Sequence, residues 1–301
     1  MKDIRDIISA EAVPYTIEPN KCRDKYFEVV GMNPSSLASG LVGTNDVDPC
    51  QVRLAWESPD QIVRTIASQD SLNRGTLAHL MMLQPELVAD RVVIWRGGRR
   101  SGNEYSEFEE ENSGKLLITA ADNANVMRAT NKMRSLPEVA SLLNGIDCEV
   151  AMLGSERCGT LDGHIIVKGQ VDGVNHSTHT IVDLKTTEAG IDQRSVERTI
   201  RNFHYREKMA MYRRWLARAT KTEPQIWKCY NIFMSLKEPY GVVIVKFTTD
   251  SLEWGTDRML ASLQGVEKCL AANNWPVFCR SIFMGVEIWE QDDFGVEVEY
   301  E

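Results

Sequence analysis

Long apolar runs are absent from this sequence. No segment of the 301 residues approaches the roughly 18 to 20 consecutive apolar residues of a membrane-spanning helix. The first residues, Met1–Asp6 (MKDIRD), also lack the apolar centre of a secretory signal peptide. We therefore expect a protein without a membrane domain that stays in the cytoplasm.

Paired cysteines and two common catalytic motifs are absent as well. The seven cysteines include no Cys-x-x-Cys pair, which argues against a structural zinc site or an iron–sulfur cluster. The chain has no Gly-x-x-x-x-Gly-Lys-Ser/Thr loop, so we expect no ATP hydrolysis. It has no Gly-x-Ser-x-Gly turn either, which argues against an α/β-hydrolase.

The composition is that of an ordinary globular chain, but its charge is distributed unevenly. Hydrophobic residues make up 43% and charged residues 26% of the sequence, enough for a sizeable core. The net charge is −9, yet residues 194–221 hold nine basic residues and two acidic ones. Such a local basic segment is either a solvated helix face or a surface for an anionic partner.

The spacing of apolar residues predicts helices before and after a central group of strands. Helices are expected over residues 71–87, 119–134, 137–143, 194–219 and 249–272, with a polar loop over 97–114. Strands are expected over residues 92–95, 148–153, 164–174, 180–187, 225–236 and 241–247. This order indicates an α/β fold with a central mixed β-sheet flanked by helices.

Two acidic residues and a lysine are placed to meet on neighbouring strands. Asp183 and Lys185 share one face of the strand at 180–187, because side chains alternate along a strand. A short hairpin through the polar turn at 175–179 would bring Asp172 beside Asp183. Two close carboxylates repel unless a cation lies between them, and oxygen ligands suit Mg²⁺ or Mn²⁺. The pattern predicts a metal site; the alternative is a surface hairpin with one Asp–Lys pair.

Several separated motifs occur in an order that resembles one known group of enzymes. They are Arg74–His79 (RGTLAH), Leu83–Glu86 (LQPE), Ile181–Thr187 (IVDLKTT) and Trp275-Pro276. Over about residues 30–285 the chain is similar to the PD-(D/E)XK nucleases, and within them to the exonuclease VIII (RecE) branch of phage and prophage recombination exonucleases. This resemblance implies a restriction-endonuclease-like core.

The resemblance assigns catalytic roles to the strand residues of the motif. Asp172 and Asp183 correspond to the metal-binding acids, and Lys185 corresponds to the catalytic lysine. Leu184 would offer its backbone carbonyl to the metal. Val171 stands where the name of the group implies proline, which is a common departure.

Further residues are matched by position. His79 corresponds to a histidine near the metal, and Glu149 to an acid that assists a second metal. Lys208 and Tyr212 hold the spacing of a Gln-x-x-x-Tyr motif, with lysine in place of glutamine. Three arginines at i, i+4 and i+7 would share one helix face and grip DNA phosphates: Arg194, Arg198 and Arg201.

The resemblance implies a Mg²⁺-dependent, ATP-independent deoxyribonuclease for which Mn²⁺ can substitute. Such an enzyme degrades the 5′ strand of linear double-stranded DNA from its ends and leaves 3′ single-stranded tails for recombination. The same resemblance implies a ring-shaped homo-oligomer and a single-strand annealing protein as partner. If the chain is phage-encoded, it would act in the cytoplasm of the bacterial host.

Two alternatives stay open on the sequence alone. One is a structure-specific or site-specific endonuclease, and the other is a non-catalytic DNA-binding protein on the same fold. A single nuclease domain is expected over residues 1–301. It would consist of an N-terminal segment (1–70), a catalytic core (71–285) and an acidic tail (286–301).

Overall fold

The computed structural model describes residues 3–19, 26, 28–42, 46–57, 69–188 and 190–276. The expected acidic tail at 286–301 lies outside these residues. Within the described ranges, no helix combines the length and the apolar character needed to cross a bilayer.

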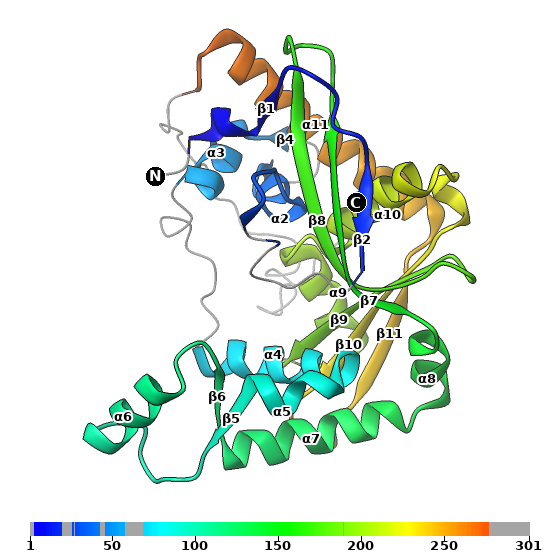
Figure 1. The fold of residues 1–301 in the computed structure, drawn as a ribbon. Helices are drawn as coiled ribbons and strands as arrows, with labels where there is room; N and C mark the ends of the chain where they lie inside the picture. Colours follow the sequence, from blue (N-terminus) through cyan, green and yellow to red (C-terminus); the bar gives the residue numbers. More distant parts are fainter. Residues whose placement is uncertain are drawn as a thin grey trace, which may run out of the picture.

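A seven-stranded mixed sheet forms the centre of the fold (Figure 1). The strand order is β11-β10-β9-β8-β7-β2, and β1 also pairs with β8. β9 and β10 run parallel, and the other neighbours run antiparallel. The strands are β1 (Ile8–Ser9), β2 (Thr16–Glu18), β7 (Asp147–Glu156), β8 (His164–Asn175), β9 (Thr180–Thr187), β10 (Lys228–Ser235) and β11 (Val242–Lys246). The predicted α/β fold class is confirmed.

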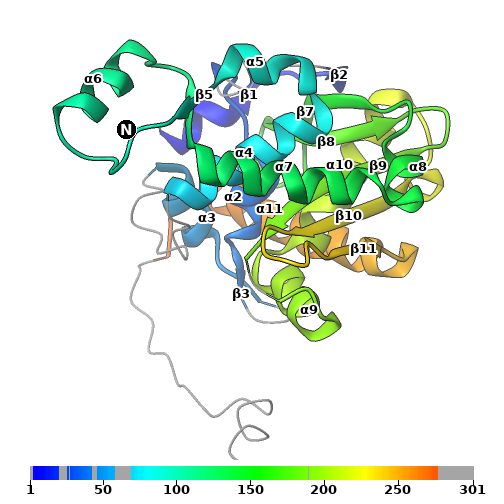
Figure 2. The same cartoon turned by 90° about the horizontal axis from the view of Figure 1, so that it is seen from below.

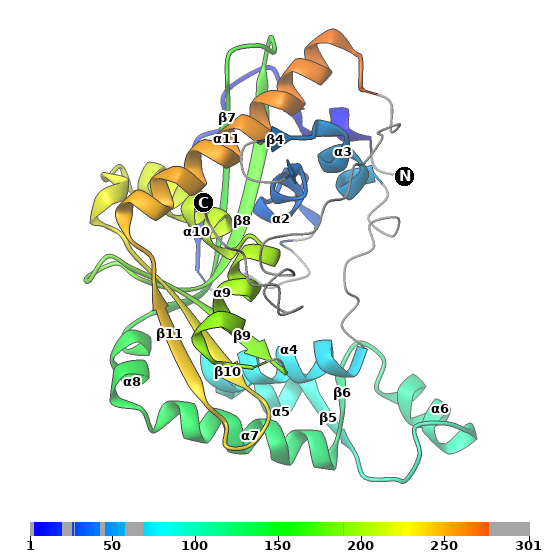
Figure 3. The same ribbon diagram turned by 180° about the vertical axis from the view of Figure 1, so that it is seen from behind.

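Alternating side chains give the sheet an apolar layer on each face. In β9, Ile181 belongs to one buried cluster, whereas Val182 and Leu184 belong to the other. Helices cover the first cluster, and Figure 3, which views the molecule from behind, shows them. These are α2 (Pro34–Ala38), α3 (Pro49–Glu57), α10 (Tyr205–Thr220) and α11 (Thr249–Ala272), with the β3 (Leu41–Val42) and β4 (Asp46–Val47) pair beside α11.

The second cluster is covered by helices that lie in front of the strands in Figure 2. They are α4 (Gln69–Leu83), α7 (Ala120–Arg134) and α8 (Pro137–Leu143). α7 begins as predicted, because the Thr119 hydroxyl accepts a 3.0 Å hydrogen bond from the backbone N–H of Asp122. α4 and α7 pack against each other and carry the buried side chains Leu77, Val126 and Met133.

The predicted loop at 97–114 is wrong, because this segment contains α6 (Asn103–Glu111). It connects the parallel strands β5 (Val92–Trp95) and β6 (Leu116–Thr119), and α6 projects from the body in Figures 1 and 3. The ring of Trp95 contacts Tyr105 at 5.3 Å and Phe108 at 5.0 Å between ring centres. These two aromatic residues, one helical turn apart, hold a helix that is otherwise polar. Between α4 and β5 lie η3 (Pro85–Leu87) and α5 (Val88–Arg91).

The single basic helix predicted over 194–219 is also wrong, because the chain forms two helices. α9 (Gln193–Asn202) ends at Phe203, and His204 has a left-handed backbone conformation with a φ of 53° before α10 begins. Both halves are amphipathic, so the spacing of apolar residues does not reveal the break. α10 packs against α11 and then leads through η4 (Pro224–Ile226) to β10.

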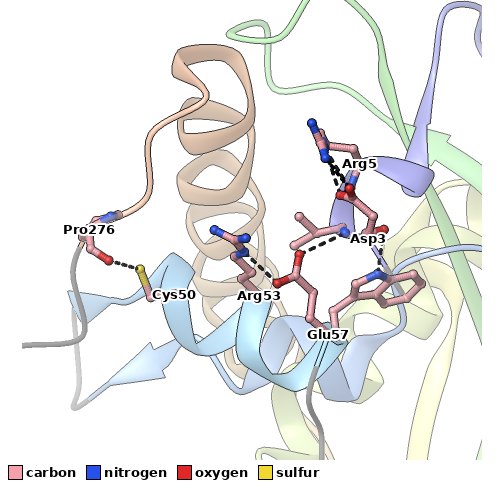
Figure 4. Close-up of polar contacts among 8 residues, drawn as sticks. Asp3, Arg5, Cys50, Arg53, Glu57 and Pro276 are labelled. Atoms are coloured by element: carbon pink, nitrogen blue, oxygen red, sulfur yellow. Dashed lines mark hydrogen bonds and ion pairs between the residues drawn. The ribbon is translucent and has the colours of Figure 1, made fainter. Parts of the chain in front are cut away.

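The N-terminal segment is tied to α3 (Figure 4). Glu57 accepts hydrogen bonds from the backbone N–H of Ile4 at 3.3 Å and from Arg53 at 2.9 Å. The indole N–H of Trp56 donates to the carbonyl of Asp3 at 3.2 Å. These contacts fix η1 (Ile4–Ile7) beside the helices of the first cluster, far along the chain from the catalytic motif.

Candidate active site

The two motif acids lie where β8 and β9 stop pairing. The antiparallel ladder ends at Gly173 opposite Val182, so Asp172 and Asp183 are the next residues on the two strands. The backbone N–H of Leu184 donates a 2.6 Å hydrogen bond to the Asp172 carboxylate. In a continued ladder this N–H would instead bind a backbone carbonyl of β8. The strands therefore separate at the motif, and one acid occupies the gap. The backbone register thus places Asp172 and Asp183 at adjacent positions of the two neighbouring strands.

Leu184 contributes through its backbone. Its side chain is buried in the second apolar cluster, away from the acids. The N–H and C=O of one strand residue point to the same side, and the N–H of Leu184 points at Asp172. The carbonyl of Leu184 therefore faces the gap, as its expected role as a metal ligand requires.

α4 brings His79 to the same place. Its Nδ1 lies 3.5 Å from an Asp172 carboxylate oxygen. Burial opposes the charged imidazole, but the negative charge of Asp172 raises the pKa of His79 above its usual value. α4 can approach β9 closely because residue 75 is glycine, and a Cβ there would lie 3.1 Å from the Thr186 hydroxyl oxygen.

Glu149 completes a cluster of possible metal ligands. It lies on β7 between the pairs Cys148–Gly173 and Val150–Val171, which places it opposite Asp172. Its φ of 49° is rare for a non-glycine residue in a strand, and such conformations cluster at functional sites. Ligand atoms of His79, Glu149 and Asp172 all lie within 4.8 Å of one another, whereas the Asp183 carboxylate, which pairs with Lys185, is not part of this group.

These residues fit a divalent metal ion. Two carboxylates with an imidazole are common ligands of Mn²⁺ and related ions, and the Leu184 carbonyl adds an oxygen suited to Mg²⁺. Burial, reinforced by the nearby charge of Asp172, raises the pKa of Asp183, whereas His79 and Lys185 lower the pKa of Asp172 despite its burial. A cation bound between the acids would relieve this repulsion.

Lys185 is held as a charged ammonium. Its Nζ lies 2.5 Å from an Asp183 carboxylate oxygen, on the same face of β9 as predicted. Burial alone would lower the pKa of Lys185, but Asp183 and Asp172 raise it well above its usual value. In this arrangement the Lys185 ammonium lies beside the acids, where it can stabilise negative charge.

The first turn of α10 lies beside Lys185 and contains a residue that the motif did not indicate. The ring of Tyr205 lies 5.1 Å from the Nζ of Lys185 and 5.5 Å from that of Lys208. Tyr212 is half-buried against β8 beside Gly169, and burial together with the charge of Asp183 raises its pKa. Tyr205 lies three residues before Lys208 and seven before Tyr212, so it belongs to the same helix face. Extending that face by one turn toward the N-terminus would have identified it.

Asn231 is a second residue that the motif did not indicate. It pairs with Asp183 in the parallel register of β9 and β10, so both side chains lie on one face of the sheet. It is fully buried, and neither polar side-chain atom has a hydrogen-bond partner among the described residues. The sequence does carry a signal for this residue, because Asn231 is the one side-chain amide in the otherwise largely apolar strand KCYNIFMS.

The three arginines expected to contact DNA lie outside this cluster. Arg194, Arg198 and Arg201 are exposed on α9, and none forms an ion pair with another described residue. By contrast, Arg74 of the RGTLAH motif is tied to Glu188 at the end of β9 and to Asp122 of α7. Arg74 therefore holds α4 against the sheet, whereas the arginines of α9 are available to an anionic partner.

A mixed sheet that opens beside two acids and a lysine defines the PD-(D/E)XK class of nuclease folds. Residues 48–284 match the family described as PDDEXK-like domain of unknown function (DUF3799). The chain belongs to this family, which confirms the superfamily predicted from its motifs. Family and fold together support a nuclease.

One solved structure agrees with this fold. The chain is similar to a protein from Eubacterium rectale that is provisionally described as an exonuclease, with a TM-score of 0.53 and 14% identity over 91% of this chain and 98% of that one. A phage-related exonuclease from Haemophilus somnus 129PT is more distant, with a TM-score of 0.34 and 10% identity over 81% of this chain and 97% of that one. A search of curated proteins found no match.

Proposed function

We propose that the protein is a Mg²⁺-dependent, ATP-independent exonuclease that degrades the 5′ strand of linear double-stranded DNA. The observation that carries this proposal is the convergence of Asp172, Asp183 and Lys185 at the separation of β8 and β9. The result of the reaction would be a 3′ single-stranded tail. Mn²⁺ would substitute for Mg²⁺.

The residues divide the chemistry among them. A bound divalent ion would supply a Lewis acid and a water of lowered pKa. Asp172, Asp183 and the Leu184 carbonyl would hold it, with His79 beside Asp172 and Glu149 opposite Asp172 for a second ion. Lys185, held protonated by its neighbours, would stabilise the charge that develops on the scissile phosphate.

DNA would be gripped from the α9–α10 side of this centre. The guanidinium groups of Arg194, Arg198 and Arg201 are exposed on α9, one turn after another. Lys208 and Tyr212 continue from α10 toward the acids, and a lysine at position 208 can pair with a phosphate directly. These contacts involve the DNA backbone, so they would carry no sequence preference.

The wider setting is proposed by resemblance to phage and prophage recombination exonucleases. There the enzyme acts as a ring-shaped homo-oligomer on duplex ends and passes the 3′ tail to a single-strand annealing protein. A structure-specific or site-specific endonuclease is the competing candidate, because the same cluster can cut within a strand. A ring around the duplex favours cleavage from an end.

The test compares end-labelled linear duplex with closed circular duplex in the presence of Mg²⁺. An exonuclease of the proposed polarity releases the 5′ label as small products early, keeps the 3′ label on long strands, and leaves the circle intact. Early release of the 3′ label contradicts the polarity, and cutting of the circle supports an endonuclease. EDTA serves as the control for metal dependence.

A further inference from the structure

An exposed aromatic side chain lies beside the candidate active site. Phe203 is 43% exposed, and no other Phe, Tyr or Trp in the described ranges is as open to solvent. It occupies the break between α9 and α10, directly before the left-handed His204. A single exposed apolar residue is common on protein surfaces, so exposure alone assigns it no role.

The geometry of its ring is more informative. Phe203 stacks on Tyr205 with a centre-to-centre distance of 5.6 Å and an angle of 17° between the planes. Tyr205 in turn lies 5.1 Å from the Nζ of Lys185. One face of the Phe203 ring is therefore occupied by a partner that also touches the catalytic lysine. Its exposed surface extends this stack outward from the site.

The distances suit a nucleic-acid strand. The two contacts place the centre of the Phe203 ring within about 11 Å of the Lys185 ammonium. Successive base pairs of duplex DNA are spaced about 3.4 Å apart. A phosphate at Lys185 and a base at Phe203 would therefore belong to nucleotides no more than about three steps apart.

The surroundings favour a charged strand over a protein partner. Basic side chains precede and follow the stack in the chain: Arg198 and Arg201 are exposed on α9, and Lys208 lies over the ring of Tyr205. The other large apolar residues that are exposed in the described ranges belong to other segments of the chain: Val30, Val42, Leu72, Met127 and Ile226. An isolated aromatic ring among cations is the arrangement by which proteins bind single-stranded nucleic acids.

We propose that Phe203 forms a base-stacking subsite that takes one unpaired nucleobase of the strand being cleaved, within about three nucleotides of the scissile phosphate. This inference rests on the proposed nuclease function. It adds a contact to a base, whereas the other proposed DNA contacts involve phosphates. Stacking is tolerant of sequence, because every base presents a π-face.

The test removes either the Phe203 ring, by substitution, or the stacked nucleobase, by an abasic nucleotide in the substrate. Single-stranded and duplex oligonucleotides with one abasic nucleotide, moved along the first six positions from the cleaved end, are digested in Mg²⁺ by the parent and by Phe203→Ala. Phe203→Trp tests rescue by another planar ring, and Phe203→Leu keeps apolar bulk without a ring. Ile226→Ala is the matched control, because Ile226 is 42% exposed on η4.

With the parent, one abasic position should raise KM roughly 5- to 150-fold, the range of a single base–aromatic stack. Phe203→Ala should show a similar rise on intact DNA and no further rise at that position, while Phe203→Trp and Ile226→Ala resemble the parent. An abasic effect of equal size in the parent and in Phe203→Ala overturns the subsite, and so does an unchanged KM for Phe203→Ala on intact DNA. If the parent cleaves none of these substrates, the nuclease function itself fails.

Discussion

Gly75 of α4 and Thr186 of β9 approach so closely that a Cβ on residue 75 would lie 3.1 Å from the Thr186 hydroxyl oxygen. This contact sets the distance between α4 and the strand that carries the motif. His79, one helical turn beyond Gly75, reaches Asp172 only because α4 lies this near. A packing contact outside the metal cluster thus positions one of its members.

The first prediction concerns Gly75→Ala. Alanine normally stabilises a helix interior by about 1 kcal/mol relative to glycine. In the parent background the new methyl group should clash with the Thr186 hydroxyl, reduce this stabilisation and lower DNA cleavage by displacing His79. In the Thr186→Ala background the clash is absent, so Gly75→Ala should give the full stabilisation. Urea unfolding of the parent, the two single variants and the double variant measures this coupling, and equal effects of Gly75→Ala in both backgrounds contradict it.

A second prediction concerns metal binding without catalysis. Mn²⁺ should raise the thermal midpoint of the parent, because an ion bound only by the folded state stabilises it by about 2.7 kcal/mol at one hundred times its Kd. Asp172→Asn should remove most of this shift. Asp162→Asn changes an exposed acid after β7 and should keep it. A full Mn²⁺ shift in Asp172→Asn would place the ion elsewhere.

The third prediction concerns the α9 arginines. Replacing Arg198 and Arg201 together by alanine should weaken DNA binding equally for all sequences. Loss of two phosphate contacts should reduce the slope of log K against log salt by about 2. Arg91→Ala with Lys132→Ala removes two exposed charges from α5 and α7 as a control. An unchanged slope for the α9 variant shows that these arginines do not grip DNA.

The fourth prediction is a pH dependence of stability from Glu207. Burial would raise the pKa of this carboxyl, but His204 and Arg206 lower it to about 2, and Arg258 lies 2.9 Å away. A lowered pKa stabilises the fold above the ordinary value of 4.5, and this contribution disappears as the pH falls to about 2. It amounts to roughly 3 kcal/mol.

Glu207→Gln should therefore lower the unfolding free energy at pH 7 and flatten its decline between about pH 4.5 and pH 2. Glu253→Gln replaces an exposed acid of α11 and should leave the decline unchanged. Urea unfolding at several pH values measures both. A decline in Glu207→Gln as steep as that of the parent would contradict the assignment.

The sheet and the meeting of the acids could be predicted because they depend on local patterns. Alternation along β9 placed Asp183 and Lys185 on one face, and the short turn after Asn175 fixed the register that puts Asp172 opposite Asp183. The hairpin needs no long-range information. The motif order then supplied His79 and Glu149, which lie on distant segments of the chain.

The rest depended on tertiary contacts. α6 forms because Trp95 supplies an aromatic partner for Tyr105 and Phe108, which a polar local sequence does not indicate. The break before α10 accompanies burial of Glu207 beside Arg258 of α11, 51 residues further along the chain. Such pairs are invisible to the spacing of apolar residues.

The central claim is that Asp172, Asp183 and Lys185 act together on a phosphodiester bond. Single-turnover digestion of linear duplex by Asp183→Asn and Lys185→Met tests it, with circular dichroism to verify folding. Each variant should lose at least roughly 10²- to 10³-fold in rate, the size of losing one group that stabilises developing charge. Folded variants that digest DNA at the parental rate would contradict the claim.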